Sequence, residues 1–590
     1  MRIILFLLLC ISTLGFAQDK TPVKRDPYLQ TPSTAKPQPQ RPEDKIKIIH
    51  ADKIIKDPAK YEGNQYFTGN VQIEHQGSVL TADEVVLYNE ENFVKAIGNT
   101  RLQNTDGSVI TAGEMEYDGN TQKGVARKNV VLTDPKQTIK TDILYYDRLS
   151  NQAYFNTGGT INDSQGNVMY TKSATYFLNT KMIDFVGNVK IDNAQYIIEG
   201  VNIKQNQNTK VAEFFGPTTI TNRANPKNRI YTERGTYRME TKEAFLNKNS
   251  KIFYNDKILT GDDMYFNQLT GFGKATGNVT LDDPKEKRYI KGGYGEIFEK
   301  KDSAMMTKSP YAVKVMEKDS IYFAAEKILS YQRPDSLDIN VKKSFLRAYK
   351  KARIYKSNAQ GRADSIAFNE TDGVMHMYTK PILWSGEKQV TGDKVEAYFN
   401  TKNENIDSLK VIGNALAISK VDSLNLKDEF NQVKGKFMTV YYENNDIKEA
   451  RVVGNAQSIA YVDDTDQETK KPERIGITLS ACGIIGALFE EKGLQIISCS
   501  IGATSDTYPM SKIEPAKRKF PDFNWNTKDR IRKWQDILVD TPNNEEIKYT
   551  GDSELYDEAQ NAIEKERAKE EAKKPKRVRK IKDLSPFHNL

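Results

Sequence analysis

The sequence has very few of the residues on which most catalytic and metal centres are built. It holds three cysteines, four histidines and three tryptophans among 590 residues. No two histidines have the spacing of metal ligands, and we expect His50 and His75 to be surface residues rather than ligands. The sequence therefore predicts no metal and no cofactor.

Motifs for phosphate binding and nucleophilic catalysis are also missing. The Gly-rich stretch at 292–295 is not followed by a helical pattern, as a phosphate loop would be. The stretch that begins at Gly551 lacks the second glycine of a nucleophile elbow. Acidic pairs such as Asp262-Asp263 fall in an expected exposed corner, where carboxylates are normally solvated. We predict that the chain is not an enzyme.

Only one apolar run is long, and it lies at the N-terminus. It follows Arg2 and ends in the small-x-small triplet Gly15-Phe16-Ala17, which is typical of a cleaved secretory signal peptide. It is too short for a membrane-spanning helix with proper flanks. Residues 1–17 are therefore predicted to be a signal peptide, with a lipoprotein anchor at Cys10 as the less favoured alternative. The mature chain is expected to be exported and soluble.

The positive charge is confined to the two ends of the chain. The net charge is +8; residues 1–45 carry seven Lys/Arg against four Asp/Glu, and residues 561–590 carry ten against five. The body is therefore neutral, and we expect no nucleic-acid partner. Residues 18–45 are predicted to be a disordered linker rich in Pro and Gln, and residues 556–590 a charged helix followed by a basic disordered tail.

What the body does contain is a repeat. Gly-Asn pairs recur, and the fourth residue after each glycine-like position is apolar at steps of 29 to 32 residues. Regular self-similarity of this kind is typical of repeat architectures, and here it predicts repeats over residues 46–460. The apolar positions are Ile73, Leu102, Leu132, Ile161, Ile191, Ile220, Ile252, Leu281 and Val313.

Each repeat has a second phrase, as in LTADEVVLYN, ITAGEMEYDG and LTGDDMYFNQ. The first apolar residue of the phrase is followed by others five and seven residues later. A step of five does not keep side chains on the same face of a regular strand, so the strand must switch face at the T-[AG]-[DG]-[DE] stretch, and a bulge or corner is expected there. Turns rich in Asn, Asp and Gly join the strands. The predicted fold class is all-β: an extended β-jellyroll or solenoid built from repeats of antiparallel bent strands, with a period of about 30 residues.

Residues 461–555 depart from this period and are predicted to be atypical β units that end in a cap on the stack. They contain Cys482 and Cys499, the only cysteines that remain after signal removal. A hairpin turning on residues 489–492 would place Leu488 opposite Gly493 and Cys482 opposite Cys499. In an oxidising compartment this pairing predicts a disulfide.

The stretches IHADKII, QYFTGNVQIEHQGSVLTADEVVLY and AIGNTRLQ resemble the OstA-like family of periplasmic lipopolysaccharide-transport proteins. Residues 49–103 match its pattern closely, and later units up to 460 match it more loosely. The resemblance implies a β-jellyroll whose apolar groove carries acyl chains across the periplasm. It also implies a periplasmic location associated with the outer membrane. The expected partners are lipopolysaccharide or a related glycolipid, other envelope transport components that add as strands at the open N-terminal edge, and further copies joined end to end.

The residues expected to line the groove form two facing sets, each of which occupies a position that recurs along the repeats. The alternatives are a structural β-solenoid with a dry core and no ligand, and, least favoured, a carbohydrate-active enzyme, for which an acid/base pair is missing. The predicted lining residues are Ile73, Val85, Leu102, Met115, Leu132, Leu144, Ile191, Ile220, Met264 and Leu281.

Overall fold

The computed structural model describes residues 25–29 and 45–538, except 58, 60, 255, 317–318, 403–404, 422–427, 466–471 and 491–492. The chain divides into two compact units, Met1–Val539 and Asp540–Leu590, and all the described residues lie in the first. The predicted signal peptide and the predicted C-terminal helix and tail fall outside the described residues.

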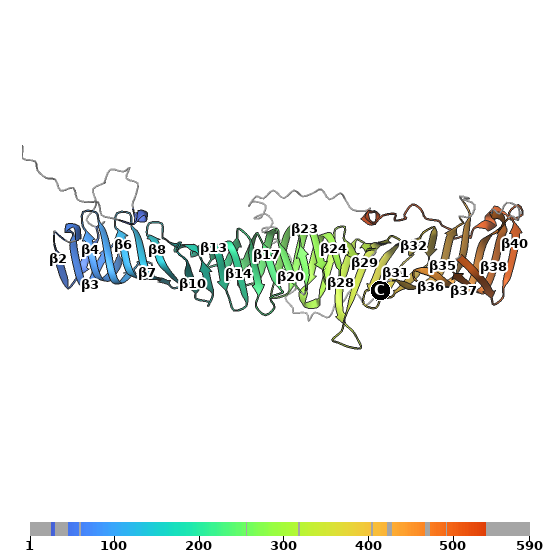
Figure 1. The fold of residues 1–590 in the computed structure, drawn as a ribbon, viewed down its shortest axis with the longest axis horizontal. Coiled ribbons are helices and arrows are strands. Elements are labelled where there is room, and N and C mark those ends of the chain that lie inside the picture. Colours follow the sequence, from blue (N-terminus) through green and yellow to red (C-terminus); the bar gives the residue numbers. More distant parts are fainter. Residues whose placement is uncertain are drawn as a thin grey trace, which may run out of the picture. The chain divides into compact units, whose positions relative to one another are not determined.

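The described residues form one antiparallel sheet of 40 strands and contain no α-helix, which confirms the all-β fold class. Figure 1 shows the strands stacked one after another in chain order. The first strands are β1 (Lys47–His50), β2 (Lys53–Lys56), β3 (Gln65–His75), β4 (Ser78–Tyr88), β5 (Phe93–Gln103), β6 (Val109–Asp118), β7 (Lys123–Asp134), β8 (Gln137–Asp147), β9 (Gln152–Phe155), β10 (Gly159–Asp163), β11 (Val168–Thr171), β12 (Ser173–Phe177) and β13 (Met182–Asp192).

The stack continues through its middle and C-terminal parts. The middle strands are β14 (Tyr196–Asn206), β15 (Val211–Phe214), β16 (Thr218–Asn222), β17 (Arg229–Thr232), β18 (Arg234–Arg238), β19 (Glu243–Lys248), β20 (Lys251–Tyr254), β21 (Lys257–Thr260), β22 (Asp263–Asn267), β23 (Phe272–Asp283), β24 (Arg288–Phe298), β25 (Ser303–Thr307) and β26 (Tyr311–Lys314). The last are β27 (Ile321–Ala324), β28 (Lys327–Pro334), β29 (Lys342–Lys356), β30 (Ala359–Asn369), β31 (Val374–Tyr378), β32 (Ile382–Ser385), β33 (Lys388–Thr391), β34 (Lys394–Phe399), β35 (Ile406–Lys420), β36 (Phe430–Glu443), β37 (Asp446–Thr465), β38 (Pro472–Glu490), β39 (Gly493–Ser500) and β40 (Thr504–Pro509). The helical turns are η1 (Pro27–Leu29), η3 (Tyr61–Gly63), η4 (Glu299–Lys301), η5 (Pro515–Arg518) and η6 (Trp534–Leu538).

The recurring Gly-Asn pair is the corner at which a strand bends. In β5, Gly98 and Asn99 have φ of +78° and +43°, a conformation that Gly and Asn adopt most readily. The Asn99 side-chain amide donates to Asp83 Oδ2 over 2.8 Å. Asp83 belongs to the neighbouring strand and comes from the second repeated phrase, so the two phrases together build one corner. The same bond recurs between Asn70 and Asp52, Asn278 and Asp262, and Asn414 and Asp393.

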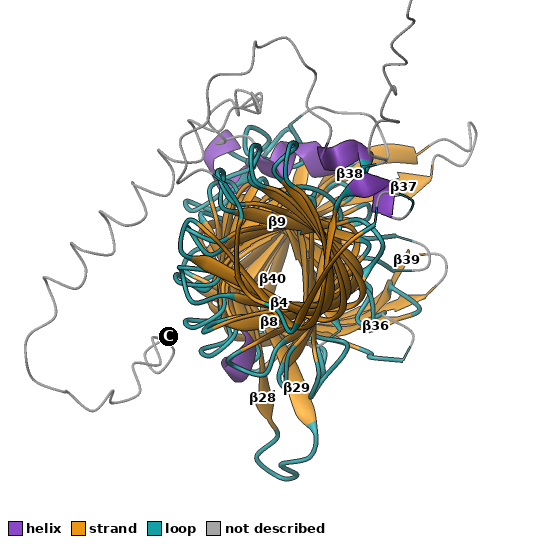
Figure 2. Cartoon of the chain, turned by 90° about the vertical axis from the view of Figure 1, so that its left-hand side faces the viewer, coloured by secondary structure: helices purple, strands orange, loops and turns teal. Residues whose placement is uncertain are grey.

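The expected bulge lies at this corner. The pairing of β4 with β5 shifts register between Thr81 and Glu84, and that of β6 with β7 shifts between Thr111 and Glu114. Each long strand therefore has two halves that turn toward each other around a shared interior. Figure 2 shows this winding from one end of the stack.

We expect Gly98→Ala to lower the free energy of unfolding by about 2–4 kcal/mol. A Cβ at this position would overlap the Asp83 carboxylate, in addition to the strain of a positive φ. The matched control is Gly107→Ala, at a φ of +84° with no atom within 4 Å of the added Cβ. It should cost only about 1–2 kcal/mol for the backbone strain. Chemical denaturation measures both, and equal losses would remove the role assigned to the corner contact.

The interior consists of two continuous rows of apolar side chains. In one row, cross-strand partners follow one another without a break from Ile73 through Leu80, Leu102 and Ile110 to Leu132, and onward to Leu281. The other row alternates large and small residues, as in Val85, Ala96, Met115, Ala126 and Leu144. Both rows belong to one core cluster that extends from Ile46 to Ile485. Alternating large and small side chains lets the two halves of each strand close on each other.

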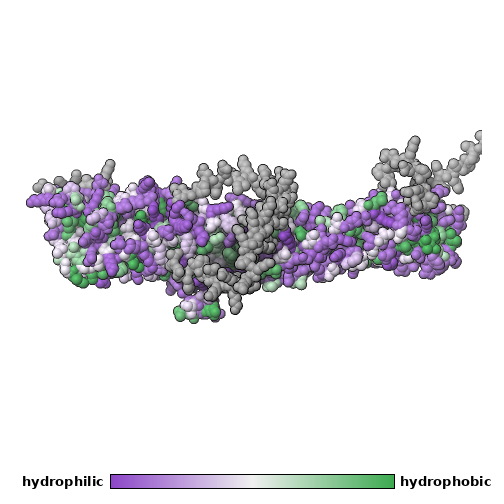
Figure 3. Space-filling view, turned by 180° about the vertical axis from the view of Figure 1, so that it is seen from behind, coloured by the Kyte–Doolittle hydropathy of each residue, from purple (hydrophilic) through white to green (hydrophobic). Residues whose placement is uncertain are grey.

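Within the residues that the structure describes, both ends of the stack are open edges. At the N-terminal edge, β1 and β2 expose Ile49, Ile54 and Ile55. At the other, all six residues of β40 are exposed, and β39 presents Leu494, Ile496 and Ile497 to solvent. Figure 3 shows hydrophobic side chains gathered at both ends of the stack.

The predicted boundary at 460 and the predicted C-terminal cap are wrong where the structure describes them. The stack continues through β38 to β40, because β37 and β38 keep the same bent pairing as earlier strands. Residues 510–538, the C-terminal strap, do not cover the edge but run back along the outside of earlier strands (Figure 1). The aromatic and aliphatic residues of the strap pack on outward apolar side chains of earlier strands. These contacts hold the strap along the side of the stack and not over its edge. The outward residues that they cover include Leu416, Ile418, Phe430, Ala324, Ile459 and Ile477.

Part of the predicted linker 18–45 is also structured. Leu29 is 1% exposed and packs on the outer face of β3–β7, and Arg25 donates to Asp118 Oδ2 over 2.8 Å. The polar composition of the segment hid this anchor, because only Tyr28 and Leu29 make the apolar contacts. The outer cluster around Leu29 comprises Tyr66, Val86, Tyr88, Phe93 and Val125.

In the structure Cys482 and Cys499 form a disulfide, with Cα atoms 5.8 Å apart. The register from which the bond was predicted is wrong, since Glu490 rather than Leu488 lies opposite Gly493, and Cys499 lies opposite Ile485. Residues Gly476 to Ala481 of β38 pair with β40, and residues Ile484 to Glu490 pair with β39. Cys482 stands at this change of partner and so meets Cys499 although the two are not directly opposed.

Candidate functional site

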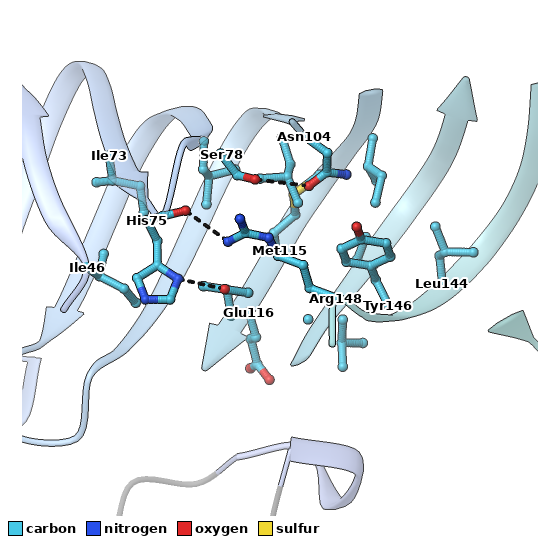
Figure 4. Close-up of a pocket in the computed structure, with 17 residues that line it drawn as sticks. Ile46, Ile73, His75, Ser78, Asn104, Met115, Glu116, Leu144, Tyr146 and Arg148 are labelled. Carbon is cyan, nitrogen blue, oxygen red and sulfur yellow. Dashed lines mark hydrogen bonds between the residues drawn. The ribbon is translucent and has the colours of Figure 1, made fainter. Parts of the chain in front are cut away.

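A cavity of about 40 Å³ opens in the N-terminal units, between β3 and β8 (Figure 4). Its existence follows from two small residues in β7. Gly124 pairs with Tyr117 of β6 on one side and with Tyr146 of β8 on the other. Ala126 likewise pairs with Met115 of β6 and Leu144 of β8. The missing side-chain volume of β7 leaves a gap in the core. The apolar part of the lining is Ile46, Ile73, Leu80, Leu102, Ile110, Met115, Val125, Ala126 and Leu144.

One end of the cavity is polar. His75 is 4% exposed, and its Nδ1 lies 2.8 Å from the Tyr117 hydroxyl. Burial raises the pKa of both Tyr117 and Tyr146, so both phenols are neutral at physiological pH. The remaining polar lining residues are Ser78, Asn104, Glu116 and Arg148.

Arg148 closes this end by joining parts of the chain that are far apart in sequence. It follows β8, and its guanidinium donates to the backbone oxygens of His75, over 2.9 Å, and Gln76, over 2.6 Å. Figure 4 shows it reaching across to the end of β3. Both acceptors are neutral backbone carbonyls, and the guanidinium lies at the mouth of an apolar cavity.

Similar bonds close the line along which the two halves of the strands meet, which we call the seam. Lys181 donates to Asp134 over 3.1 Å, and Lys257 donates to Asp302 over 2.7 Å. Farther along, buried Arg288 contacts both Asp283 and Glu370. The pairs Lys181–Asp134, Lys257–Asp302 and Arg288–Glu370 join turns of different repeats and hold the seam shut over the middle of the stack.

This arrangement can orient an amphiphile. The cavity combines apolar walls with a cationic, hydrogen-bonding end, and such sites orient a ligand by a few polar groups. Within the described ranges there is no group of three or more residues that could hold a metal ion. In the same part of the chain, no helix is long and apolar enough to cross a membrane.

The structure places four of the ten predicted lining residues in this cavity, namely Ile73, Leu102, Met115 and Leu144. The other six are buried in the same two rows away from the cavity, and they are Val85, Leu132, Ile191, Ile220, Met264 and Leu281. Contact of any of them with lipid stays a prediction.

Sequence reasoning missed the polar end of the cavity. The surface position expected for His75 is wrong, and the signal was present, because His75 is two residues from Ile73 and shares its inward face. His50 is exposed, as expected, beside Asp52. Nothing in the local sequence points to Arg148, whose contacts lie more than 70 residues away.

Comparison with known protein families finds a match to one segment of the chain. The family model of the OstA-like protein matches residues 43–201. No curated protein matches the chain. Among solved structures, LptH, described as the LptA-homologous periplasmic component of the conserved lipopolysaccharide transport device from Pseudomonas aeruginosa, is 12% identical with a TM-score of 0.20, and the match covers 26% of this chain and 99% of that one. All the residues that line the cavity lie between Ile46 and Arg148. The resemblance read from the sequence is therefore confirmed over residues 43–201; this part of the chain, which we call the OstA-like segment, matches the family model and contains the whole cavity.

Proposed function

We propose that this chain is an exported, periplasmic bridging protein of the lipopolysaccharide-transport type, which holds the acyl chains of lipopolysaccharide or a related glycolipid in the interior of its stack. The observation that carries the proposal is the unbroken apolar row from Ile73 to Leu281, which opens at a cavity inside the OstA-like segment. Export by residues 1–17 and association with the outer membrane are part of the proposal.

The cavity as it stands has room for only a few water-sized groups. An acyl chain can therefore enter only if the two halves of the strands part, beginning at the end held by Arg148. About ten buried methylenes would contribute roughly 8 kcal/mol. That is enough to offset the loss of the two hydrogen bonds from Arg148 to backbone carbonyls, at about 1.5–3 kcal/mol each.

The competing function is a dry structural scaffold. Its support is the tight packing of the interior, since Leu132, Ile191 and Ile220 are fully buried against neighbouring side chains. Native mass spectrometry of the purified protein separates the two functions. Co-purifying lipopolysaccharide or lipid A supports transport, and a lipid-free chain supports the scaffold.

A photo-crosslinking residue at Leu102 or Met115 should capture an acylated glycolipid in cells, in the periplasmic fraction. Both side chains line the cavity, and the probe keeps their bulk, whereas alanine would only destabilise the core. The same probe at Gln72 or Arg101, on the outer face of the same strands, is the control and should capture none. Capture at neither inner position, in folded protein, would favour the scaffold.

Deletion of residues 46–56 should abolish association at the N-terminal edge, both with envelope components and end to end with another copy. The segment contains β1 and β2, whose outer sides have no strand partner among the described residues, and such an edge invites strand addition. Sedimentation and pull-down measure the association. Circular dichroism should show that the remaining sheet is intact, and unchanged association would count against edge docking.

A further inference from the structure

A second cavity, of about 260 Å³, lies on the seam beyond the OstA-like segment. It is bounded by the turn between β16 and β17 on one side and by η4 on the other. Its floor consists of Ile230, Ile252 and Phe266, which are buried members of the core cluster. A ligand here would therefore touch the apolar interior while its polar part stays at the surface.

Arg229 is the main cation at its rim. Its guanidinium carbon lies 4.0 Å above the centre of the Phe253 ring, which faces it across the pairing of β17 with β20. Among the described residues, no hydrogen bond or ion pair engages this guanidinium. Stacking fixes the plane of the group and leaves its N–H edges available, which is the geometry that binds a carboxylate or phosphate by two bonds.

The other rim residues are suited to sugar hydroxyls. Asn228 donates to Glu299 across the seam, and the Gln268 side-chain oxygen accepts from Tyr237 over 2.8 Å, which leaves its amide N–H groups for a ligand. Lys300 donates to the backbone oxygen of Leu269 over 2.6 Å and adds a second positive charge. Amide, carboxyl and ammonium groups at one rim can donate to and accept from hydroxyls at the same time.

We propose that this cavity binds a sugar residue that carries an acidic group, with the phosphate or carboxylate on Arg229 and Lys300 and the hydroxyls on Asn228, Gln268 and Glu299. The inference rests on the proposed function for the source of the sugar, the head of a glycolipid whose acyl part lies in the stack. The volume is below the roughly 300–1,000 Å³ that encloses drug-sized ligands, so one sugar ring fits rather than an oligosaccharide.

Isothermal titration of the full chain with glucosamine 6-phosphate tests the site. We expect binding that weakens by about tenfold or more in Arg229→Gln and in Lys300→Gln, because each variant removes a charge-assisted bond. Lys172→Gln, at an exposed corner and not among the residues that line the cavity, removes the same charge and should leave binding unchanged. Arg229→Lys should recover only part of the affinity, since it restores the charge without the planar fork.

Further probes separate the possible ligands. Glucuronic acid should bind with a similar affinity if a carboxylate serves as well as a phosphate. Glucosamine and inorganic phosphate alone should each bind more weakly than the sugar phosphate. No binding of the sugar phosphate, binding indifferent to Arg229, or equal binding of inorganic phosphate would overturn the inference. Sugar-phosphate binding in a chain whose interior captures no lipid would support this site and count against the proposed function, so the two can fail independently.

Discussion

Replacing Arg288 with alanine will lower the free energy of unfolding by about 3–5 kcal/mol. The side chain is 7% exposed and contacts Asp283 and Glu370, which are 8% and 9% exposed. Removing it leaves two carboxylates buried without their cation, and the cost of an unpaired buried charge far exceeds the net value of the pair. Hydrogen exchange in β24 and β30 should report the loss locally, because strands of a repeat stack contact mainly their neighbours.

The exposed pair Lys227–Asp256 is the matched control. Its side chains are 72% and 46% exposed, so Lys227→Ala should change stability by no more than about 1 kcal/mol. Replacing Arg288, Asp283 and Glu370 together with apolar residues of similar size should restore most of the lost stability. If Arg288→Ala and Lys227→Ala cost the same, the seam pairs contribute nothing beyond surface electrostatics.

The double variant Gln389→Leu with Gln432→Leu should detach the C-terminal strap. The Gln389 side chain is 1% exposed. Its amide donates to the Asn524 backbone oxygen over 2.6 Å, and its oxygen accepts from the Asn526 backbone N–H over 2.9 Å. Gln432 makes the same pair of bonds, to the Arg518 oxygen and from the Phe520 nitrogen, each over 3.0 Å. Each leucine leaves two backbone groups of the strap without a partner.

The expected loss is about 2–6 kcal/mol for the double variant, from about 1–3 kcal/mol at each glutamine. Limited proteolysis should then cleave within residues 510–538, followed by mass spectrometry of the shortened chain. Gln360→Leu is the control, because the side-chain amide of this buried glutamine donates to the backbone oxygens of Lys356 and Ser357 in its own hairpin and not to the strap. A strap that stays resistant in the double variant would show that its remaining contacts, among them the aromatic packing and the bonds from Trp384 and Arg353, are enough to hold it.

Much of the fold could be predicted because its requirements are local. A positive φ at a corner selects Gly and Asn, and the period of two along a strand selects alternating apolar residues. Each requirement recurs once per repeat, so the all-β class, the bulge at the T-[AG]-[DG]-[DE] stretch and the inward rows from Ile73 to Leu281 could be read directly. Beyond Val313, the last of the regularly spaced apolar positions, the stack contains a longer hairpin, β28–β29, which projects from it (Figure 1).

The candidate site was only partly predictable. Ile73, Leu102, Met115 and Leu144 were correctly placed on inward faces, but the cavity between them depends on Gly124 and Ala126 of the strand that separates their partners. A small residue leaves a cavity only if the neighbouring side chains do not collapse into its place. Strand patterning alone does not say whether they do.

By itself, the sequence determined which residues turn a corner and which face inward, because backbone sterics and strand periodicity act within a few residues. Only the tertiary structure decided how distant turns meet across the seam. It brought Arg148 to the carbonyl of His75, Arg288 to Glu370, and the strap to Gln389. These contacts join residues more than 70 positions apart, so they depend on the number of strands stacked between them and on the angle through which each corner bends, and no local pattern encodes either quantity.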